Sequence, residues 1–280
     1  MKKVLVTGAT GFVGKPIVDD LVNRGYQVII ASRNIVQATT PNVVVKPFDL
    51  NFLDHKTDYF KYFNYPDVCI HLAWIGLPNY LDEIHLKQLP QHERFLENLL
   101  SNGLQELTVT GTCFEYGLIE GELKEDMVSF PVTAYGKGKY ALTKWLINRQ
   151  NERAANVKSL RLFYMWGEGQ SPKSLIPMLN AAIERGDSSF PMSGGEQVRD
   201  FLPVEEMARR IVILALNPAA TGIINCCSGK PITLKGFVKQ YLSRKNASIS
   251  LHFGVYPYLD YEPMAFWGSV KKLNSFLKEN

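Results

Sequence analysis

The chain has 280 residues, of which 46% are hydrophobic and 21% charged, and its formal net charge is +4. This length suits one large α/β domain, or a large lobe carrying a smaller one, and it buries enough surface to fold without a disulfide or metal staple. The positive charge is modest and spread along the chain, so we expect no nucleic-acid partner, whereas a phosphorylated small substrate would suit it.

Cysteine usage and hydropathy bear on the compartment. The four cysteines lack the spacing of metal ligands, so we expect free thiols in a reducing cytoplasm and no metal site: Cys69, Cys113, Cys226 and Cys227. No apolar run approaches the roughly 18 residues of a transmembrane helix, and no cleavable leader is expected at Met1-Lys2-Lys3. We therefore expect no membrane association.

Apolar runs and helical periodicities alternate along the first part of the chain. Strands are predicted at residues 4–6, 28–30, 43–45, 68–70, 107–109 and 157–163. Helices are predicted at residues 12–24, 55–63, 86–102 and 134–155, with Gly25 ending the first. Strands that alternate with helices predict an α/β fold with a Rossmann-like parallel sheet covered on both faces.

The pattern changes after residue 163. Glycine, proline and serine become frequent, and shorter helices are predicted at residues 173–185, 204–216, 232–243 and 269–278. We therefore divide the chain into a dinucleotide-binding domain, residues 1–163, and a smaller α/β lobe, residues 164–280, that mainly binds substrate.

Three glycines spaced three apart lie between the first strand and the first helix: Gly8, Gly11 and Gly14. The first permits a tight turn, the second lets backbone N–H groups approach a pyrophosphate, and the third allows close helix–strand packing. The helix N-terminus adds partial positive charge for the phosphates. This turn, with Thr10, Phe12 and Val13, is predicted to bind a dinucleotide.

The residues after the second strand bear on the choice of cofactor. An NAD site usually has an acidic residue there for the ribose 2′-hydroxyl, but this chain has Ser32 and Arg33. Both side chains can bind a 2′-phosphate, so we favour NADP(H) over NAD(H), although Arg33 could instead stack on adenine or face solvent. Asp49 and Leu50, after the third strand, are expected near the adenine, although Asp49 could equally cap a turn.

Tyr135 and Lys139 lie four residues apart, which places them on one face of the predicted long helix. A nearby ammonium favours the phenolate of a tyrosine and so suits acid–base catalysis. Thr112 follows the strand at residues 107–109, at the sheet edge where ligands bind. It could hydrogen-bond a reacting carbonyl, although Thr110 or Cys113 could face the site instead.

These motifs resemble those of the extended short-chain dehydrogenase/reductases, in particular the nucleotide-sugar epimerase/dehydratase family, over nearly the whole chain. The resemblance implies that Thr112, Tyr135 and Lys139 are catalytic. It also implies that the cofactor contacts the glycine turn, the segment after the fourth strand, Tyr135, Lys139 and Phe163; that segment is Leu72, Ala73 and Trp74. Helices at residues 86–102 and 134–155 would form a homodimer contact.

The same resemblance implies a site for a nucleotide diphosphate sugar. Cys113, Phe114 and Tyr164 would contact the sugar, with Tyr164 standing where many relatives have Asn. Arg199 would hold the diphosphate, or else form a structural salt bridge, and Lys173 would contact phosphate or lie in solvent.

Three activities compete. Relatives that dehydrate sugars carry Asp-Glu after the catalytic threonine, and Cys113 and Phe114 cannot do that acid–base work. A 4-epimerase with tightly bound NAD predicts an acidic residue after the second strand, which is missing. We therefore favour an NADPH-dependent reductase that acts at C4 of a nucleotide-activated 4-keto-6-deoxy sugar in deoxysugar and surface polysaccharide synthesis. The epimerase, and a non-catalytic NADP-binding protein of this fold, remain the alternatives.

Overall fold

A computed structural model describes residues 1–34, 40–152 and 155–277. Its main feature is a seven-stranded sheet with the order β11-β7-β5-β4-β1-β2-β3, in which every pairing is parallel. The strands are β1 (Lys3–Thr7), β2 (Gln27–Ser32), β3 (Val43–Pro47), β4 (Val68–His71), β5 (Glu106–Thr112), β7 (Asn156–Leu162) and β11 (Gly222–Cys226). The predicted Rossmann-like α/β fold is confirmed.

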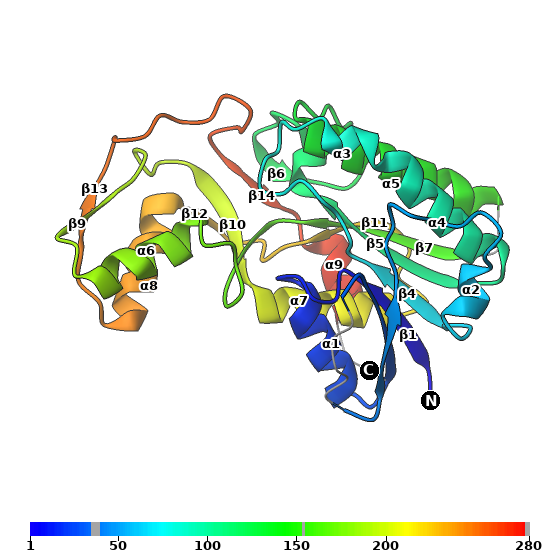
Figure 1. The fold of residues 1–280 in the computed structure, drawn as a ribbon. Coiled ribbons are helices and arrows are strands. Elements are labelled where there is room, and N and C mark those ends of the chain that lie inside the picture. The colour runs from blue at the N-terminus through cyan, green and yellow to red at the C-terminus, as the bar shows by residue number, and fades with distance from the viewer. Residues whose placement is uncertain (35–39, 153–154, 278–280) are drawn as a thin grey trace.

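Helices cover both faces of this sheet (Figure 1). One face carries α1 (Gly14–Asn23), α7 (Val204–Leu216) and α9 (Lys271–Leu277), and the other carries α2 (Tyr59–Tyr62), α4 (Leu89–Ser101) and α5 (Ala134–Glu152). Val4 and Val6 pack toward the first set, whereas Leu5 packs toward the second. Successive strand residues point to opposite faces, so an all-apolar strand is what a sheet covered twice requires.

A smaller lobe lies beside this sheet, on the left of Figure 1. It contains a three-stranded sheet of β12 (Pro231–Thr233), β10 (Val198–Pro203) and β8 (Tyr164–Trp166), the pair β9 (Ser189–Pro191) and β13 (Ser250–His252), and the helices α6 (Leu175–Arg185) and α8 (Leu234–Lys245). Residues after 163 also supply β11, α7 and α9 to the large lobe. The division of the chain at residue 163 stays a prediction.

Two short elements, a strand and a 3-10 turn, lie between β5 and α5. β6 (Gly121–Leu123) pairs with β14 (Phe266–Gly268), although more than a hundred residues separate them in the sequence. A 3-10 turn, η1 (Cys113–Tyr116), follows β5 directly. The pairing ties the segment after β5 to the C-terminal part of the chain, and this brings distant residues to one place.

Some predicted helix limits differ from those observed. The helix expected at residues 55–63 is only α2, because the Asp54 carboxylate accepts hydrogen bonds from Lys56 N and Thr57 Oγ1 and holds a local turn there. The helix expected at residues 86–102 is divided at Gln88 into α3 (Ile84–Lys87) and α4. Residues 153–154 and 278, at the expected ends of two helices, lie outside the described residues.

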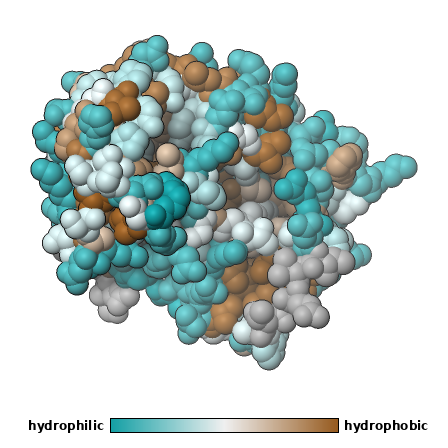
Figure 2. Space-filling model, turned by 60° about the vertical axis from the view of Figure 1, so that its left-hand side comes forward, coloured by the Kyte–Doolittle hydropathy of each residue, from teal (hydrophilic) through white to brown (hydrophobic). Residues whose placement is uncertain are grey.

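Two further properties of the described residues concern membranes and metals. Within the described ranges no helix is both long and apolar enough to cross a bilayer, and no three or more His, Cys, Asp or Glu side chains group as metal ligands. All four cysteines are free and buried. On the face seen in Figure 2, hydrophobic residues reach the surface in separate areas among hydrophilic ones.

Candidate active site

A pocket of about 380 Å³ lies at the carboxyl ends of the strands of the large sheet. This is the edge at which ligands bind in open parallel sheets. The lining combines the glycine turn, the segments after β4 and β5, helix α5, and the start of the smaller lobe. Its residues are Phe12, Val13, Leu72, Trp74, Leu77, Pro78, Tyr80, Thr110, Gly111, Thr112, Cys113, Phe114, Tyr135, Lys139, Leu162, Phe163, Tyr164, Met165, Gln170, Ser171 and Ser174.

The glycine turn has the geometry that a pyrophosphate cradle needs. Gly8 has a φ of +70°, and a Cβ there would lie 2.8 Å from Ala73 N. A Cβ on Gly14 would lie 2.1 Å from Gly8 O, so only glycine lets α1 pack this closely on β1. Gly11 N donates to Gly8 O over 3.0 Å and closes the turn, with Thr10 exposed beside it. The residues present therefore fit a dinucleotide.

The residues predicted for the adenosine end lie outside this pocket lining. Ser32 ends β2, and its Oγ accepts from Asn34 N over 3.3 Å, while Arg33 is exposed beyond it. Asp49 Oδ1 accepts from both Asn51 N (2.9 Å) and Asn51 Nδ2 (3.0 Å), so this carboxylate holds a local turn. Leu50 packs against the core beneath α4 and α5. Their contacts with a cofactor stay predictions.

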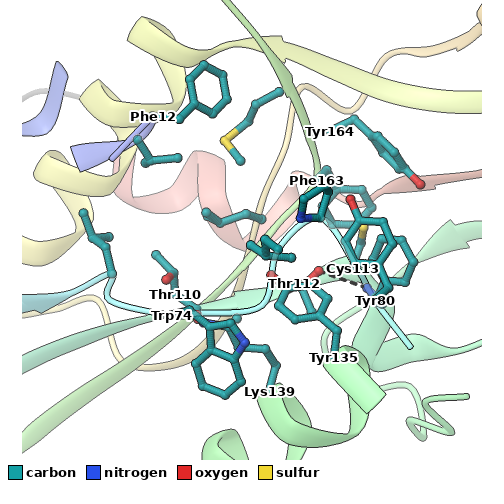
Figure 3. Close-up of a pocket in the computed structure, with 18 of the residues that line it drawn as sticks. Phe12, Trp74, Tyr80, Thr110, Thr112, Cys113, Tyr135, Lys139, Phe163 and Tyr164 are labelled. Carbon is teal, nitrogen blue, oxygen red and sulfur yellow. Dashed lines mark hydrogen bonds between the residues drawn. The ribbon is translucent and has the colours of Figure 1, made fainter. Parts of the chain in front are cut away.

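Tyr135 and Thr112 meet in the pocket (Figure 3). Tyr135 is the second residue of α5, and its side chain is buried. Burial raises the pKa of the Tyr135 phenol above its ordinary value, and a hydrogen bond with the Thr112 side chain opposes that rise. A phenol in this setting is protonated at neutral pH and can donate its proton.

Lys139 lies one helical turn further along α5, with its side chain buried in the same pocket. Its Nζ donates to Thr110 O over 2.7 Å and lies 4.0 Å from the centre of the Trp74 ring system. Burial lowers the pKa of Lys139 to about 7, while the Glu115 carboxylate raises it. The ammonium is therefore poised between its charged and neutral forms near physiological pH.

A buried ion pair supports Thr112 from behind. Glu115 Oε1 accepts from Thr112 N over 2.9 Å, and Glu115 Oε2 accepts from Arg161 Nε over 3.0 Å. Both side chains are fully buried. A Cβ on Gly111 would lie 2.3 Å from Glu115 Oε1, so glycine is needed for the carboxylate to reach this place. The sequence analysis did not predict this pair. The acidic residue Glu115, three positions after Thr112, could have indicated a buried partner for a cation.

A chain of neutral polar groups fixes the end of β4. His92 Nε2 contacts Gln88 Oε1 (3.1 Å), His92 Nδ1 contacts His71 Nε2 (2.8 Å), and His71 Nδ1 contacts Thr7 Oγ1 (2.8 Å). Thr7 Oγ1 accepts from the backbone N–H groups of Leu72 and Ala73, each over 3.2 Å. Burial lowers the pKa of His71 to about 3 and that of His92 well below its usual range. Both imidazoles serve structure in this arrangement.

Aromatic side chains form the wall opposite the glycine turn. Tyr80 stacks on Phe114 with ring centres 4.6 Å apart, and its ring centre lies 5.5 Å from that of Tyr135. Cys113 and Tyr164 lie beside them (Figure 3). Among the described residues that line the pocket, Lys139 is the one charged side chain. This part of the pocket therefore suits a neutral, partly apolar group.

Two cations predicted to bind phosphate lie outside the pocket lining. Arg199 is buried: its Nη2 donates to Glu262 Oε2 over 2.8 Å, and its Nη1 donates to the carbonyls of Val198 and Met264. Tyr164 Oη also donates to Glu262 Oε2, over 2.7 Å. Lys173 is exposed beside Ser171 and Ser174, which do line the pocket. Glu262, 98 residues beyond Tyr164, carried no sequence signal that could have linked the two.

The sequence pattern of the NAD dependent epimerase/dehydratase family matches residues 4–227. The chain is 27% identical over 274 residues to dTDP-6-deoxy-L-talose 4-dehydrogenase (NAD(+)) of Aggregatibacter actinomycetemcomitans, covering 95% of this chain and 99% of the relative. It is 24% identical over 278 residues to dTDP-4-dehydro-6-deoxyglucose reductase of Escherichia coli, covering 89% and 84%.

The fold is also similar to that of a solved structure, UDP-glucuronic acid 4-epimerase from Bacillus cereus in complex with UDP-glucuronic acid and NAD. The TM-score is 0.82 at 21% identity, with 99% of this chain and 93% of the other covered. At this identity the similarity shows the fold alone. The relatives by sequence therefore carry more weight for the chemistry than the relatives by structure.

Proposed function

The chain belongs to the NAD dependent epimerase/dehydratase family, and from this membership we propose that it reduces a nucleotide-activated 4-keto-6-deoxy sugar at C4 with NADPH. Membership itself means an enzyme that modifies nucleotide sugars with a nicotinamide cofactor, as the motifs predicted. The direction of the reaction, the sugar and the preference for NADPH are the proposal.

One observation carries this proposal: Thr112, Tyr135 and Lys139 line one pocket in which the residues after Thr112 are Cys113 and Phe114. Neither can act as an acid or base at neutral pH, since burial raises the pKa of the Cys113 thiol and Phe114 has no titratable group. Dehydration needs such groups beside the sugar, whereas reduction of a ketone needs one proton donor and a hydride. The pocket supplies the proton donor.

The roles of the three residues follow from their chemistry. NADPH, when bound, supplies the hydride that adds to C4 of the sugar. Tyr135 gives its phenolic proton to the C4 oxygen as negative charge develops there, and Thr112 hydrogen-bonds the same oxygen. The Lys139 ammonium then stabilises the phenolate left on Tyr135 until solvent returns the proton. The raised pKa of Tyr135 suits reduction, because the phenol stays protonated until negative charge develops on the C4 oxygen of the sugar.

The wall formed by Tyr80, Cys113 and Phe114 supports a 6-deoxy sugar. A methyl group at C5 can pack on such a surface, whereas a C5 carboxylate against it would lose its hydration and meet no charged side chain of this wall, at a cost of several kcal/mol. Two sequence relatives act on 6-deoxy sugars, a 6-deoxy-L-talose and a 4-dehydro-6-deoxyglucose, each carried by dTDP. We propose a substrate of this class.

The preference for NADPH rests on Ser32 and Arg33 at the end of β2. No acidic side chain follows this strand directly, so the usual partner of the NAD ribose 2′-hydroxyl is missing. An exposed guanidinium and a hydroxyl are groups that bind a 2′-phosphate through charge-assisted hydrogen bonds. For the sugar diphosphate, we propose the polar edge of the pocket at Gln170, Ser171 and Ser174, with Lys173 and Arg199 as the predicted cations.

A homodimer built from α4 and α5 is part of the same proposal, because the family resemblance implies it. The alternatives are a 4-epimerase with tightly bound NAD and a non-catalytic NADP-binding protein. The convergence of Thr112, Tyr135 and Lys139 in one pocket argues against the second.

The test is a panel of nucleotide-linked 4-keto-6-deoxy sugars carrying dTDP, GDP, CDP or UDP, each mixed with the protein and either NADPH or NADH. We expect loss of the reduced cofactor with at least one sugar, faster with NADPH. No oxidation with any sugar, together with interconversion of nucleotide hexoses without added cofactor, would support the epimerase. If the protein catalyses neither cofactor oxidation nor hexose interconversion, the non-catalytic NADP-binding protein is the remaining alternative.

A further inference from the structure

Trp74 has contacts that the predicted role of a cofactor-lining residue does not explain. Its indole faces the Lys139 ammonium, with Nζ 4.0 Å from the ring centre, well within the distance for a cation–π interaction. Figure 3 shows the two side chains next to each other, with Tyr135 beside them. Tryptophan attracts cations more strongly than the other aromatic side chains, and the attraction grows when water is excluded.

The indole is itself held in one orientation. Trp74 Nε1 donates to His85 Nδ1 over 2.9 Å, so the second imidazole nitrogen carries the proton and donates to Asn79 O over 2.8 Å. His92 stacks on the indole with ring centres 4.5 Å apart and planes 27° apart. An aromatic ring fixed at its N–H and on its face can present a fixed surface to a cation.

Lys139 has few other groups to keep it charged. Thr110 O, on β5, accepts from Nζ, and Glu115, on η1, is the charged group that raises the lysine pKa. His71 on β4 and His92 on α4 are neutral, because their pKa values are lowered by burial. Tyr135, on α5, is neutral because its pKa is raised. Burial works against the ammonium, and the indole is the further contact that opposes it.

We propose that Trp74 is a positioning residue whose indole holds the Lys139 ammonium in place and in its charged form beside Tyr135 and Thr112. The inference rests on the proposed function only in giving Lys139 a catalytic task. The charge effect belongs to the protein without cofactor. Without the indole, Lys139 loses its proton at a lower pH than in the wild type. The alkaline limit of the proposed reduction then moves to lower pH by the same amount.

The test is a titration of Lys139 in the cofactor-free protein, followed through the ¹³Cε signal of labelled lysine and identified by its absence in Lys139→Met. We compare Trp74→Leu, which removes the π face, with Trp74→Phe, which keeps a smaller and weaker π face and loses the N–H bond to His85. We expect the Lys139 pKa to fall by about one unit in Trp74→Leu and by less in Trp74→Phe. Trp145→Leu, which removes an indole that lies 5.5 Å from the Arg149 guanidinium, is the matched control and should leave the titration unchanged.

Fluorinated tryptophan gives a second measurement that keeps the shape of the site. Fluorine draws electron density from the indole while adding little volume, so the Lys139 pKa should fall in steps as more fluorine is placed on the ring. This series decides the matter if Trp74→Leu does not fold. A Lys139 pKa that stays the same in the folded variants and across the series would overturn the proposal.

The outcomes also separate this proposal from the proposed function. A lowered Lys139 pKa without reduction of any 4-keto sugar would leave the role of Trp74 standing and remove the reductase. Reduction of a 4-keto sugar together with an unchanged Lys139 pKa in the Trp74 variants would support the reductase and remove the role of Trp74. With both in place, the alkaline limb of kcat against pH should move down by about one unit in Trp74→Leu, while the KM for the sugar stays nearly constant.

Discussion

The two halves of the pocket are built in different ways. The cofactor half is a single turn in which glycines bring backbone groups together: Gly8, Gly11 and Gly14 lie within seven residues of one another. The sugar half is assembled from side chains of β5, α5, β8 and the segment after β4. Glu262, which accepts a hydrogen bond from Tyr164, comes from near the C-terminus. Backbone recognition is local, whereas side-chain recognition depends on the whole fold.

This difference teaches where chemistry can change while the fold persists. Cofactor binding at the glycine turn needs the backbone of Gly14 to lie close to that of Gly8, and a side chain at residue 14 would prevent this. The sugar wall needs only side chains of suitable size and charge, such as Tyr80 and Phe114. Relatives with the same fold can therefore act on different sugars, and substitutions in the two halves should have separable effects.

The largest separable effect is expected at Tyr135. Replacing it with Phe removes the proton donor but leaves the ring packed against Tyr80 and Phe114. We expect kcat to fall by about 10²- to 10⁴-fold with little change in NADPH affinity. Steady-state kinetics and cofactor titration measure both quantities. Tyr140→Phe, on the same helix but outside the pocket lining, is the control, and undiminished turnover in Tyr135→Phe would remove the assigned mechanism.

Breaking the buried ion pair of Glu115 and Arg161 should lower the free energy of unfolding. Arg161→Met leaves the Glu115 carboxylate buried without its cation, and we expect a loss of about 3–5 kcal/mol in the free energy of unfolding. The double variant Glu115→Leu with Arg161→Met should lose less than the two single variants together, because no unpaired charge remains. Urea unfolding measures the three values. Strictly additive losses would contradict a paired role.

Arg33 tests the cofactor half alone. Arg33→Ala should reduce the preference for NADPH over NADH by about 10- to 100-fold, since a charge-assisted contact with the 2′-phosphate is lost. The ratio of kcat/KM for the two cofactors gives the result, and the KM for the sugar should not change. Arg24→Ala, at the far end of α1 where Arg24 pairs with Asp20, is the control. An unchanged ratio would mean that Arg33 does not bind the phosphate.

The smallest effect concerns pH and the histidines that fix the end of β4. His71 and His92 have lowered pKa values in the folded chain, so the unfolded chain binds more protons as the pH falls below about 6.5. Stability is therefore complete above that pH and declines below it. Between pH 7.5 and 5.5 we expect a loss of about 1 kcal/mol per histidine. Urea unfolding of the wild type and of His92→Gln checks this, and a loss of the same size in both would speak against His92.

The sequence allowed prediction of what depends on near neighbours. The alternation of most strands with helices, the glycine turn, and the predicted placement of Thr112 at the end of a strand and of Tyr135 and Lys139 on one helix all follow from short-range patterns. The pairing of Glu115 with Arg161, the stacking of Trp74 on His92 and the link from Tyr164 to Glu262 do not. These contacts join residues 18 to 98 positions apart, and only the packed fold brings them together.

Arg199 illustrates the same limit from the other side. Its sequence context suggested both a diphosphate contact and a structural salt bridge, and a guanidinium serves either purpose. Its bonds to the Glu262 carboxylate and to the Met264 carbonyl join it to a segment more than 60 residues away. Binding of a diphosphate by Arg199 would require Glu262 to release it.

The most direct test of the proposed reaction uses NADPH that carries deuterium as the transferable hydrogen at C4 of its nicotinamide ring. The protein is mixed with the labelled cofactor and the 4-keto-6-deoxy sugar nucleotide that is consumed fastest, and the product is examined by mass spectrometry and NMR. We predict one deuterium at C4 of the sugar and one equivalent of NADP⁺ formed for each sugar. Product without deuterium, or sugar interconverted while NADPH is not consumed, would contradict the assignment of this chain as a sugar-nucleotide ketoreductase.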